Sequence, residues 1–481
     1  MVPRLDPPGY EEAEAMLLKH TKNSSSSSST FAVHLHLHLS PLYRGALVLL
    51  IVSLQLTLLL STLYFPSGRL YQFYPRSSSV SSCELGMFYV YDLPPLFNRD
   101  LLAACDALNP WSSFCPALSN SGFGHSADVA GVVPASLLPS WFSTDQFAAE
   151  VIFHSRLLSH RCRTPEPYAA AAFYIPFYAG LAVGRHLWSP NATSTDLDKE
   201  FGLLLHWLEK QAAYQRSNGG WDHFITLGRI TWDFRRSREG DWGSSFLYMP
   251  GMENVTRLVI ERNPWDDKDV GIPYPTRFHP RSKEEVQFWQ QFVLNRTRST
   301  LFSFAGAVRY GFKDDFRGIL LNECAAANNS CRALDCGGGR CGNSSVGTLG
   351  LFLDSAFCLQ PRGDSFTRRS LFDCMVAGAV PVLFWKRSAY VQYKWYVPGI
   401  GEEGEWSVFI DRREVRAGNV SVRGVLEGIG DDRLRRMRER VVDMIPRLVY
   451  AAAEGMDDAV DIALNGVLRR FAEQRWRRNV G

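Results

Sequence analysis

The segment from Leu351 to Trp385, LFLDSAFCLQPRGDSFTRRSLFDCMVAGAVPVLFW, constrains the fold of this chain more than any other. It predicts an apolar strand, a Pro-Arg-Gly loop, a helix that ends in a glycine turn at Gly378, and a second buried strand. In open α/β sheets such strand–loop–helix junctions favour phosphates, because free backbone N–H groups and the helix dipole attract negative charge. The segment therefore predicts an α/β fold with a phosphate site at this loop.

The polar residues of the loop indicate what the site binds. With an N-cap at Ser365, the side chains of Ser365, Arg369 and Asp373 would share one helix face. Gly363 allows the backbone to approach a ligand closely. We expect a nucleotide diphosphate on the helix N-terminus and on Arg368 or Arg369, with Asp373 accepting hydrogen bonds from ribose hydroxyls. The spacing alone also fits a solvated helix face on which Arg369 pairs with Asp373.

From residue 83 onward the chain alternates β-branched or aromatic runs with segments of helical period. We expect strands over residues 87–94, 168–178, 221–228 and 301–311, and helices over 144–160, capped by Thr144, and 197–214. This alternation predicts an α/β architecture. The 52 Lys and Arg against 49 Asp and Glu leave a net charge of +3, which is too low for a partner such as nucleic acid.

Residues 45–65 form an apolar run of 21 residues without a charge. At ~1.5 Å per residue a helix of this length crosses a ~30 Å hydrocarbon layer. The run is longer than the roughly 7–15 residues of a signal-peptide core, so we expect a membrane anchor rather than a cleaved signal. Residues 1–44 would then be a cytosolic tail, and the Ser-rich residues 66–82 a stem.

All ten cysteines follow this run. Six N-glycosylation sequons also follow it, at Asn191, Asn254, Asn295, Asn328, Asn343 and Asn419. Both features fit a lumenal body in an oxidising compartment. We expect disulfides, with the pairing left open, rather than a zinc site among Cys324, Cys331, Cys336 and Cys341, because no CxxC pair is present. Cys358 and Cys374 are expected to be buried thiols.

The run CLQPRGDSFTRRSLFDCMVAGAVPVLF, residues 358–384, resembles the signature of exostosin-like plant glycosyltransferases, in the branch that contains xyloglucan galactosyltransferases. FYVYDLPPLFN, GGWDHFITLGRITWDFRR, VGIPYPTRFHP and FSFAGAVR agree with that family in the same order, over residues 83–400. The resemblance implies a GT-B fold, in which two Rossmann-like domains face a cleft. A single N-terminal transmembrane helix would precede them in the sequence. The acceptor-side domain would span 83–298 and the nucleotide-sugar-binding domain 299–481.

The resemblance further implies a type II Golgi membrane protein with a lumenal catalytic domain. Its activity would be inverting transfer of β-galactose from UDP-galactose to xylosyl branches of xyloglucan, without a metal cofactor. Complexes with other wall-synthesis glycosyltransferases are a further implied partnership. Transfer of galacturonic acid or arabinose, or a Golgi scaffold without catalysis, are the alternatives.

Site residues also follow from the resemblance. Arg309 and Arg368 match diphosphate contacts, Asp373 matches the ribose acid, and Asp364, in the loop before the helix, is expected to face the donor sugar. The full expected nucleotide-sugar site comprises Arg309, Gly363, Asp364, Ser365, Thr367, Arg368, Arg369 and Asp373.

An inverting transfer needs a base that takes the proton of the acceptor hydroxyl. We favour Asp233 in GRITWDF as this catalytic residue. The alternatives are Asp222, His223 and Glu150. Asp233 could instead pair with Arg235 or Arg236, and His223 could be a satisfied strand-end histidine.

Two Asp-x-Asp patterns, Asp196-Leu-Asp198 and Asp267-Lys-Asp269, resemble the metal motif of another glycosyltransferase architecture. Such short acidic patterns arise readily by chance, and Asp267 lies in a Pro-rich loop where acids are usually solvated, so we expect no metal site.

Overall fold

The computed structural model describes residues 83–109, 113–309, 315–339, 341 and 345–480, and residue 55. The chain divides into a unit of residues 1–81 and a compact unit of residues 82–481. The expected tail, anchor (45–65) and stem (66–82) lie outside the described residues, apart from residue 55. Within the described part of the chain, every helix is too short or too polar to span a bilayer.

The first sheet has five parallel strands in the order β1-β2-β3-β4-β5. The strands are β1 (Met87–Val90), β2 (Ala170–Ile175), β3 (His223–Ile230), β4 (Thr256–Glu261) and β5 (Asp269–Gly271). Successive side chains of a strand point to opposite faces. In β2, Ala172 and Tyr174 accordingly pack in one core cluster, and Phe173 and Ile175 in another.

Helices cover both faces of this sheet. The face with Tyr174 packs on α5 (Ala149–Ser159) and on the C-terminal helix α17 (Ala459–Val480). The other face packs on α3 (Arg99–Ala103), α6 (Ala179–Leu187), α7 (Ser194–Leu208) and α8 (Ala212–Arg216). The short α4 (Cys115–Leu118) also packs there.

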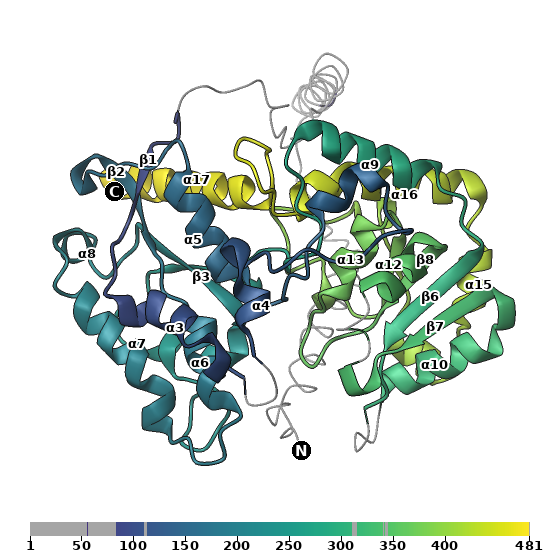
Figure 1. Ribbon diagram of the computed structural model, residues 1–481, viewed down its shortest axis with the longest axis horizontal. Helices are drawn as coiled ribbons and strands as arrows, with labels where there is room; N and C mark the ends of the chain where they lie inside the picture. The colour runs from purple at the N-terminus through teal and green to yellow at the C-terminus, as the bar shows by residue number, and fades with distance from the viewer. Residues whose placement is uncertain are drawn as a thin grey trace, which may run out of the picture. The chain divides into compact units, whose positions relative to one another are not determined.

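The second sheet is also parallel, in the order β10-β9-β8-β6-β7. Its strands are β6 (Thr300–Gly306), β7 (Cys331–Asp335), β8 (Ser355–Gln360), β9 (Val380–Leu383) and β10 (Val408–Phe409). The chain leaves β6 toward β7 on one side and then returns to β8 on the other side (Figure 1). The connections therefore diverge between β6 and β8, and ligands of open α/β sheets bind at the carboxyl ends of such a strand pair.

Helices cover the second sheet as well. One face packs on α9 (Lys283–Asn295), α12 (Ser345–Leu353), α13 (Ser370–Val376) and α16 (Asp431–Leu448). The other packs on α10 (Phe316–Ala326), α14 (Arg412–Arg416) and α15 (Val422–Glu427). The expected α/β fold, with two parallel sheets, is confirmed.

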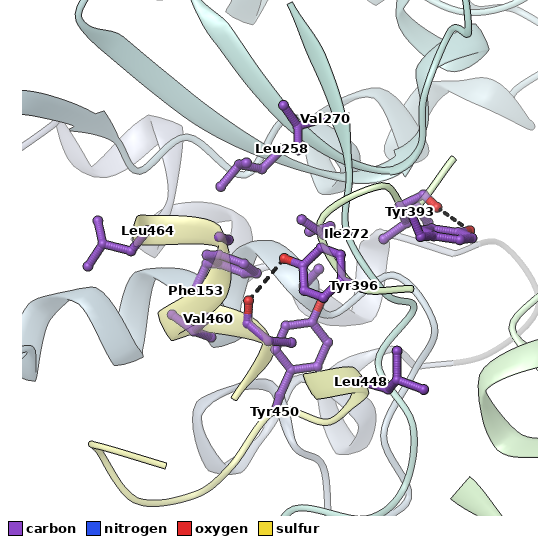
Figure 2. Close-up of a cluster of buried hydrophobic side chains, with 14 of the residues drawn as sticks. Phe153, Leu258, Val270, Ile272, Tyr393, Tyr396, Leu448, Tyr450, Val460 and Leu464 are labelled. Carbon is purple, nitrogen blue, oxygen red and sulfur yellow. Dashed lines mark hydrogen bonds between the residues drawn. The ribbon is translucent and has the colours of Figure 1, made fainter. Parts of the chain in front are cut away.

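The unit has two halves, one built on the first sheet and one on the second. Buried tyrosines join the two halves, and Figure 2 shows them with the apolar side chains that surround them. Their hydroxyls donate to backbone carbonyls: Tyr393 to Ile260 at 3.0 Å, Tyr396 to Ala459 at 3.0 Å and Tyr450 to Pro273 at 2.5 Å. Val460 and Leu464 of α17 lie in the same cluster as Leu258 of β4. The last helix, α17, belongs in sequence to the domain expected over residues 299–481, but it packs on the first sheet.

Several expected boundaries are wrong. The single helix expected over residues 197–214 is two helices, α7 and α8. The helix after the Pro-Arg-Gly loop begins at Ser370 rather than at Ser365, because residues 361–369 are held as a loop. Residues 351–353 end α12, and the strand begins only at Ser355. Thr144 does not cap α5, which begins at Ala149; its hydroxyl instead donates to the carbonyl of Phe123 at 2.7 Å.

All ten cysteines are paired. Cys324 bonds to Cys331 and Cys336 to Cys341, which confirms the expected disulfides and selects one pairing. The expectation of buried thiols at Cys358 and Cys374 is wrong, because β8 and α13 lie close enough for these residues to form a disulfide. The remaining disulfides join Cys83 to Cys162 and Cys105 to Cys115.

Candidate active site

Arg309 and the loop 361–369 meet where the connections of the second sheet diverge. Arg309 follows β6, and the loop follows β8, the strand beside it. The Arg309 guanidinium donates to the Gly363 carbonyl and to the Asp364 carboxylate. A Cβ at Gly363 would meet the Thr367 carbonyl oxygen at 2.0 Å, so this tight loop requires a glycine.

A cluster of arginines surrounds this junction. Arg368 donates from Nη2 to the Ala305 carbonyl at 2.8 Å, while its Nη1 is buried without a hydrogen-bond partner among the described residues. Arg317, at the start of α10, lies 3.6 Å from the carboxylate of Asp364. Burial, together with repulsion from the neighbouring arginines, lowers the pKa of Arg368 to about 9 and that of Arg317 to about 10.

The charges of this cluster do not cancel. Burial also lowers the pKa of Arg309, with the charge of Asp364 opposing the shift. Asp364 is the carboxylate that both Arg309 and Arg317 approach, and its side chain is 80% exposed. Arg309, Arg317 and Arg368, with Arg362 nearby, outnumber the carboxylates of Asp364 and Asp315, so the junction carries a surplus of positive charge that suits an anion.

A pocket of about 310 Å³ adjoins this junction and is lined from both halves of the unit. The second half contributes Ala305, Cys336, Cys341, Thr348, Leu349, Arg368, Arg369, Ser370, Asp373 and Val376. The first half contributes Trp141, Asp145 and Gln146, and the segment after β5 contributes Thr276 and Arg277. Three of the expected nucleotide-sugar residues, Arg368, Arg369 and Asp373, therefore line one pocket.

Arg369 and Asp373 form the ion pair that the helical spacing left open, with Nε and Oδ2 separated by 3.4 Å. Arg369 also donates to the Thr144 carbonyl at 2.7 Å, so it spans the two halves. Arg277 lines the pocket beside this pair. Burial and the charge of Arg369 lower its pKa to about 10, against the opposing charges of Asp373 and Asp145.

Thr367 faces the first sheet rather than the pocket. Its backbone N–H and its hydroxyl both donate to the Glu261 carboxylate, each at 2.6 Å. The Tyr274 hydroxyl lies 3.0 Å from the Thr367 hydroxyl. Burial raises the pKa of Glu261, while hydrogen bonds from Ser365 and Thr367 oppose this shift. Ser365 and Thr367 thus hold the loop in place.

Asp233 is buried and has two side-chain partners. Its Oδ1 accepts from the indole N–H of Trp242 at 2.8 Å, and its Oδ2 lies 3.3 Å from Nη1 of Arg229. The partner considered from the sequence, Arg235 or Arg236, is wrong: Arg235 pairs with Asp269, and Arg236 with Asp198. Asp233 is not among the pocket-lining residues.

The other base candidates are also held by the fold. His223 hydrogen-bonds the Tyr91 hydroxyl and the Asp222 carboxylate, each at 2.7 Å, so it is a satisfied strand-end histidine. Glu150 accepts from the backbone N–H groups of Gly180 at 2.6 Å and Gly228 at 2.8 Å. Burial raises the pKa of Glu150 to about 8.

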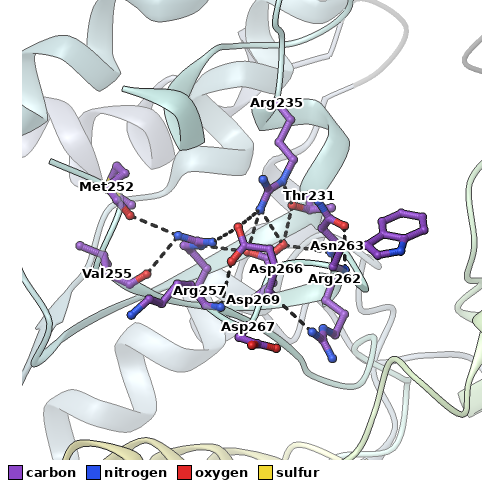
Figure 3. A network of polar contacts seen from close by, with 12 residues as sticks. Thr231, Arg235, Met252, Val255, Arg257, Arg262, Asn263, Asp266, Asp267 and Asp269 are labelled. Atoms are coloured by element: carbon purple, nitrogen blue, oxygen red, sulfur yellow. Dashed lines mark hydrogen bonds and ion pairs between the residues drawn. The ribbon is translucent and has the colours of Figure 1, made fainter. Parts of the chain in front are cut away.

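Asp269 of the second Asp-x-Asp pattern lies in a network of ion pairs (Figure 3). Asp269 is buried and pairs with Arg257 at 2.8 Å and with Arg235 at 3.0 Å. Both arginines also contact Asp266. The first pattern is divided too, because Asp196 closes the capping box of α7 and Asp198 pairs with Arg236. No group of three or more His, Cys, Asp or Glu among the described residues is arranged to hold a metal.

Aromatic rings surround Phe366 of the loop 361–369. Phe366 contacts Trp232, Trp265 and Trp385, with ring centroids 6.0, 6.3 and 5.1 Å apart. Trp265 is 50% exposed, and Tyr248, beside Arg235, is 54% exposed. Exposed aromatic faces of this kind suit the apolar faces of sugars.

Sequence reasoning missed Arg317, Glu261, Asp145 and Arg277. Two of them carry a visible signal: Glu261 follows the apolar run LVI at the end of β4, and Arg317 follows the N-cap Asp315 of α10. The other two come together only through the packing of the two halves.

Comparison with known proteins identifies the class of this fold and site. Residues 82–426 match the model of the exostosin GT47 domain. The chain is 56% identical over 404 residues to xyloglucan galactosyltransferase XLT2 of Arabidopsis thaliana, a match that covers 82% of this chain and 77% of that protein. The chain therefore belongs to the exostosin GT47 family of glycosyltransferases, as its motifs predict.

Other relatives in Arabidopsis thaliana carry two different activities in their names. Xyloglucan-specific galacturonosyltransferase 1 is 41% identical over 401 residues, covering 82% of this chain and 58% of that protein. Xyloglucan galactosyltransferase MUR3 is 40% identical over 407 residues, covering 83% and 64%. A solved GtfA/B complex aligns with a TM-score of 0.29 and 8% identity, over 58% of this chain and 61% of that one.

Proposed function

We propose that this protein is an inverting glycosyltransferase that moves galactose from UDP-galactose to xylosyl side chains of xyloglucan. The observation that carries the proposal is the arginine cluster at the carboxyl ends of β6 and β8, beside a pocket lined from both halves. The 56% identity to a xyloglucan galactosyltransferase supports the choice of sugar and acceptor.

The arginines supply what the leaving group needs. As the bond to the sugar breaks, negative charge grows on the diphosphate, and fixed guanidinium groups stabilise it without reorganisation. Arg309, Arg317 and Arg368 would bind the diphosphate, and Asp373 the ribose. Because these arginines already offset the phosphate charge, the proposed reaction needs no divalent metal.

The acceptor would approach from the first half of the unit, in a GT-B arrangement with the donor on the second sheet. Xyloglucan presents flat sugar faces, and the exposed ring of Trp265 contacts Phe366 of the loop that carries Arg368.

A second donor, UDP-galacturonic acid, is favoured by one observation. A galacturonosyltransferase is 41% identical to this chain, and a carboxylate on the sugar would suit the surplus positive charge. Purified protein with each UDP-sugar and xyloglucan oligosaccharides tests the proposal. Hexose transfer from UDP-galactose supports it, and transfer of galacturonic acid alone contradicts it. Absence of transfer from every donor would favour the scaffold alternative.

We also propose a type II Golgi location, with residues 45–65 as the anchor and residues 83–481 in the lumen. Five disulfides support an oxidising compartment. Retention of the full chain in carbonate-washed membranes and loss of that retention without residues 1–82 would support the anchor. Association with other wall-synthesis glycosyltransferases is part of the same proposal, and co-purification from Golgi membranes tests it.

A further inference from the structure

Asp145 is the carboxylate that the segment before α5 places in the pocket. It lines the pocket from the first half, and Arg368, Arg369 and Asp373 line the same pocket from the second half. Asp373 is the only other carboxylate among the pocket-lining residues that the structure describes, and it is paired with Arg369. Asp145 follows Thr144, whose carbonyl accepts a hydrogen bond from Arg369, so Asp145 lies where the two halves meet in the pocket.

The carboxylate of Asp145 is positioned but has an oxygen to spare. Its Oδ1 accepts from the backbone N–H of Phe147 at 2.8 Å, which fixes the side chain relative to α5. Among the described residues its Oδ2 accepts no hydrogen bond. Arg229 of β3, Arg277 after β5 and Arg369 before α13 act on it electrostatically. Burial nevertheless raises its pKa, with these charges opposing the shift.

We infer that Asp145 is the general base of the transfer, an inference that rests on the proposed function. The acceptor hydroxyl oxygen attacks the anomeric carbon of galactose while its proton passes to Oδ2 of Asp145. The bond from that carbon to the diphosphate oxygen breaks, and its electron pair leaves with UDP beside the arginines. Asp145 then releases the proton to solvent.

Asp145 differs from the other candidate acids because it lines the pocket. Both oxygens of Asp233 have partners within the fold, and Asp233 does not line the pocket. Glu150 is 1% exposed and does not line the pocket; its Oε1 accepts from two backbone N–H groups, and its Oε2 has no partner among the described residues. Neither is placed to reach an acceptor hydroxyl without local rearrangement.

The test compares full-length Asp145→Asn with the wild type, with Asp233→Asn and with the control Asp128→Asn, an exposed acid of the same segment. We expect Asp145→Asn to lower kcat by about 100-fold or more while Kd for UDP changes less than threefold. The wild-type rate should fall at low pH as one carboxylate protonates, and the residual rate of Asp145→Asn should lack this limb. Asp128→Asn should match the wild type.

Four results would overturn the inference. In Asp145→Asn, these results are a wild-type kcat, a rate that still falls at low pH, or an equal loss of UDP binding and of transfer. The fourth is a pH profile that loses its fall at low pH only in Asp233→Asn. If Asp145→Asn does not fold, Asp145→Glu takes its place: it should keep the acidic limb and lose at least tenfold in kcat, and unchanged kcat would contradict the role. A wild type that transfers no galactose would fail the proposed function itself, which is a different result.

Discussion

The Glu261 carboxylate, at the end of β4, accepts hydrogen bonds from both the backbone N–H and the hydroxyl of Thr367, each at 2.6 Å. Thr367 precedes Arg368 in the loop that follows β8 of the other sheet. A buried acid of the first sheet therefore fixes the loop from which Arg368 reaches the pocket. This contact explains why the helix starts only at Ser370, since the preceding residues have partners outside it.

Replacing Glu261 with Ala should loosen this loop. Buried donors left without an acceptor cost about 1–3 kcal/mol, so we expect a lower melting temperature and weaker UDP binding together. Glu261→Gln keeps one carbonyl acceptor and should lose less of both. Calorimetry with UDP and thermal unfolding of the two variants check this. Wild-type UDP affinity in folded Glu261→Ala would show that the contact does not position the loop.

Arg368→Ala and Asp373→Ala should each weaken UDP binding. Loss of a charge-assisted contact costs about 1.5–3 kcal/mol, or roughly 10-fold to 150-fold in Kd. The matched control is Arg423→Ala, which removes an exposed guanidinium paired with Glu427 on α15. Calorimetry that gives wild-type affinity in both pocket variants would remove this pocket from the donor site.

Galactose transfer should persist in excess EDTA. The arginines already offset the diphosphate charge, and Asp269 of the Asp-x-Asp pattern is committed to Arg257 and Arg235. Asp267→Asn, which leaves that buried network intact, should also retain transfer, whereas Asp269→Asn should destabilise the fold. If EDTA abolishes transfer and manganese restores it, the arginine-based account of the site is wrong.

Trp265→Ala should raise KM for xyloglucan oligosaccharides without changing Kd for UDP. Loss of an aromatic contact costs about 0.5–1.5 kcal/mol, roughly 2-fold to 12-fold in KM. Trp476→Ala removes a ring of similar exposure, 66% against 50%, from the C-terminal helix and serves as the control. Equal effects of the two substitutions would place the acceptor elsewhere.

Glu150 should make the protein less stable as pH rises. Its pKa is raised to about 8 in the folded state from 4.5 in the unfolded chain, so the folded state holds the proton more tightly. Its contribution is fully present below pH 4.5 and is lost as the pH rises through 8. Glu150→Gln should therefore remove part of the fall in melting temperature between pH 5 and 8. An identical pH dependence in the variant would contradict the assignment.

Much of the fold follows from local patterns in the chain. The alternation of apolar runs with helical periods predicts the strands around residues 87, 170, 223 and 300, because each strand carries its own signal. The pairing of Cys358 with Cys374 does not follow from such local patterns, since it depends on β8 and α13 lying side by side. The return of α17 to the first sheet depends likewise on contacts between residues far apart in the chain.

The site is predictable to the same extent. The loop 361–369 follows from motif and spacing, Arg309 follows from the family resemblance, and the structure brings them together. Glu261, Arg277 and Asp145 belong to other segments, and only packing brings them to the loop and pocket. A pattern along the chain identifies the donor loop, whereas the groups that face it come from the other half of the fold.

The most direct test of the central claim is a competition among equal amounts of UDP-galactose, UDP-galacturonic acid and UDP-arabinose for one xyloglucan oligosaccharide acceptor. The products are identified by mass and by the anomeric configuration of the new bond. We predict a single hexose added in the β configuration, by the wild type and not by Arg368→Ala. Addition of galacturonic acid or arabinose, an α bond, or full activity of Arg368→Ala would contradict the account.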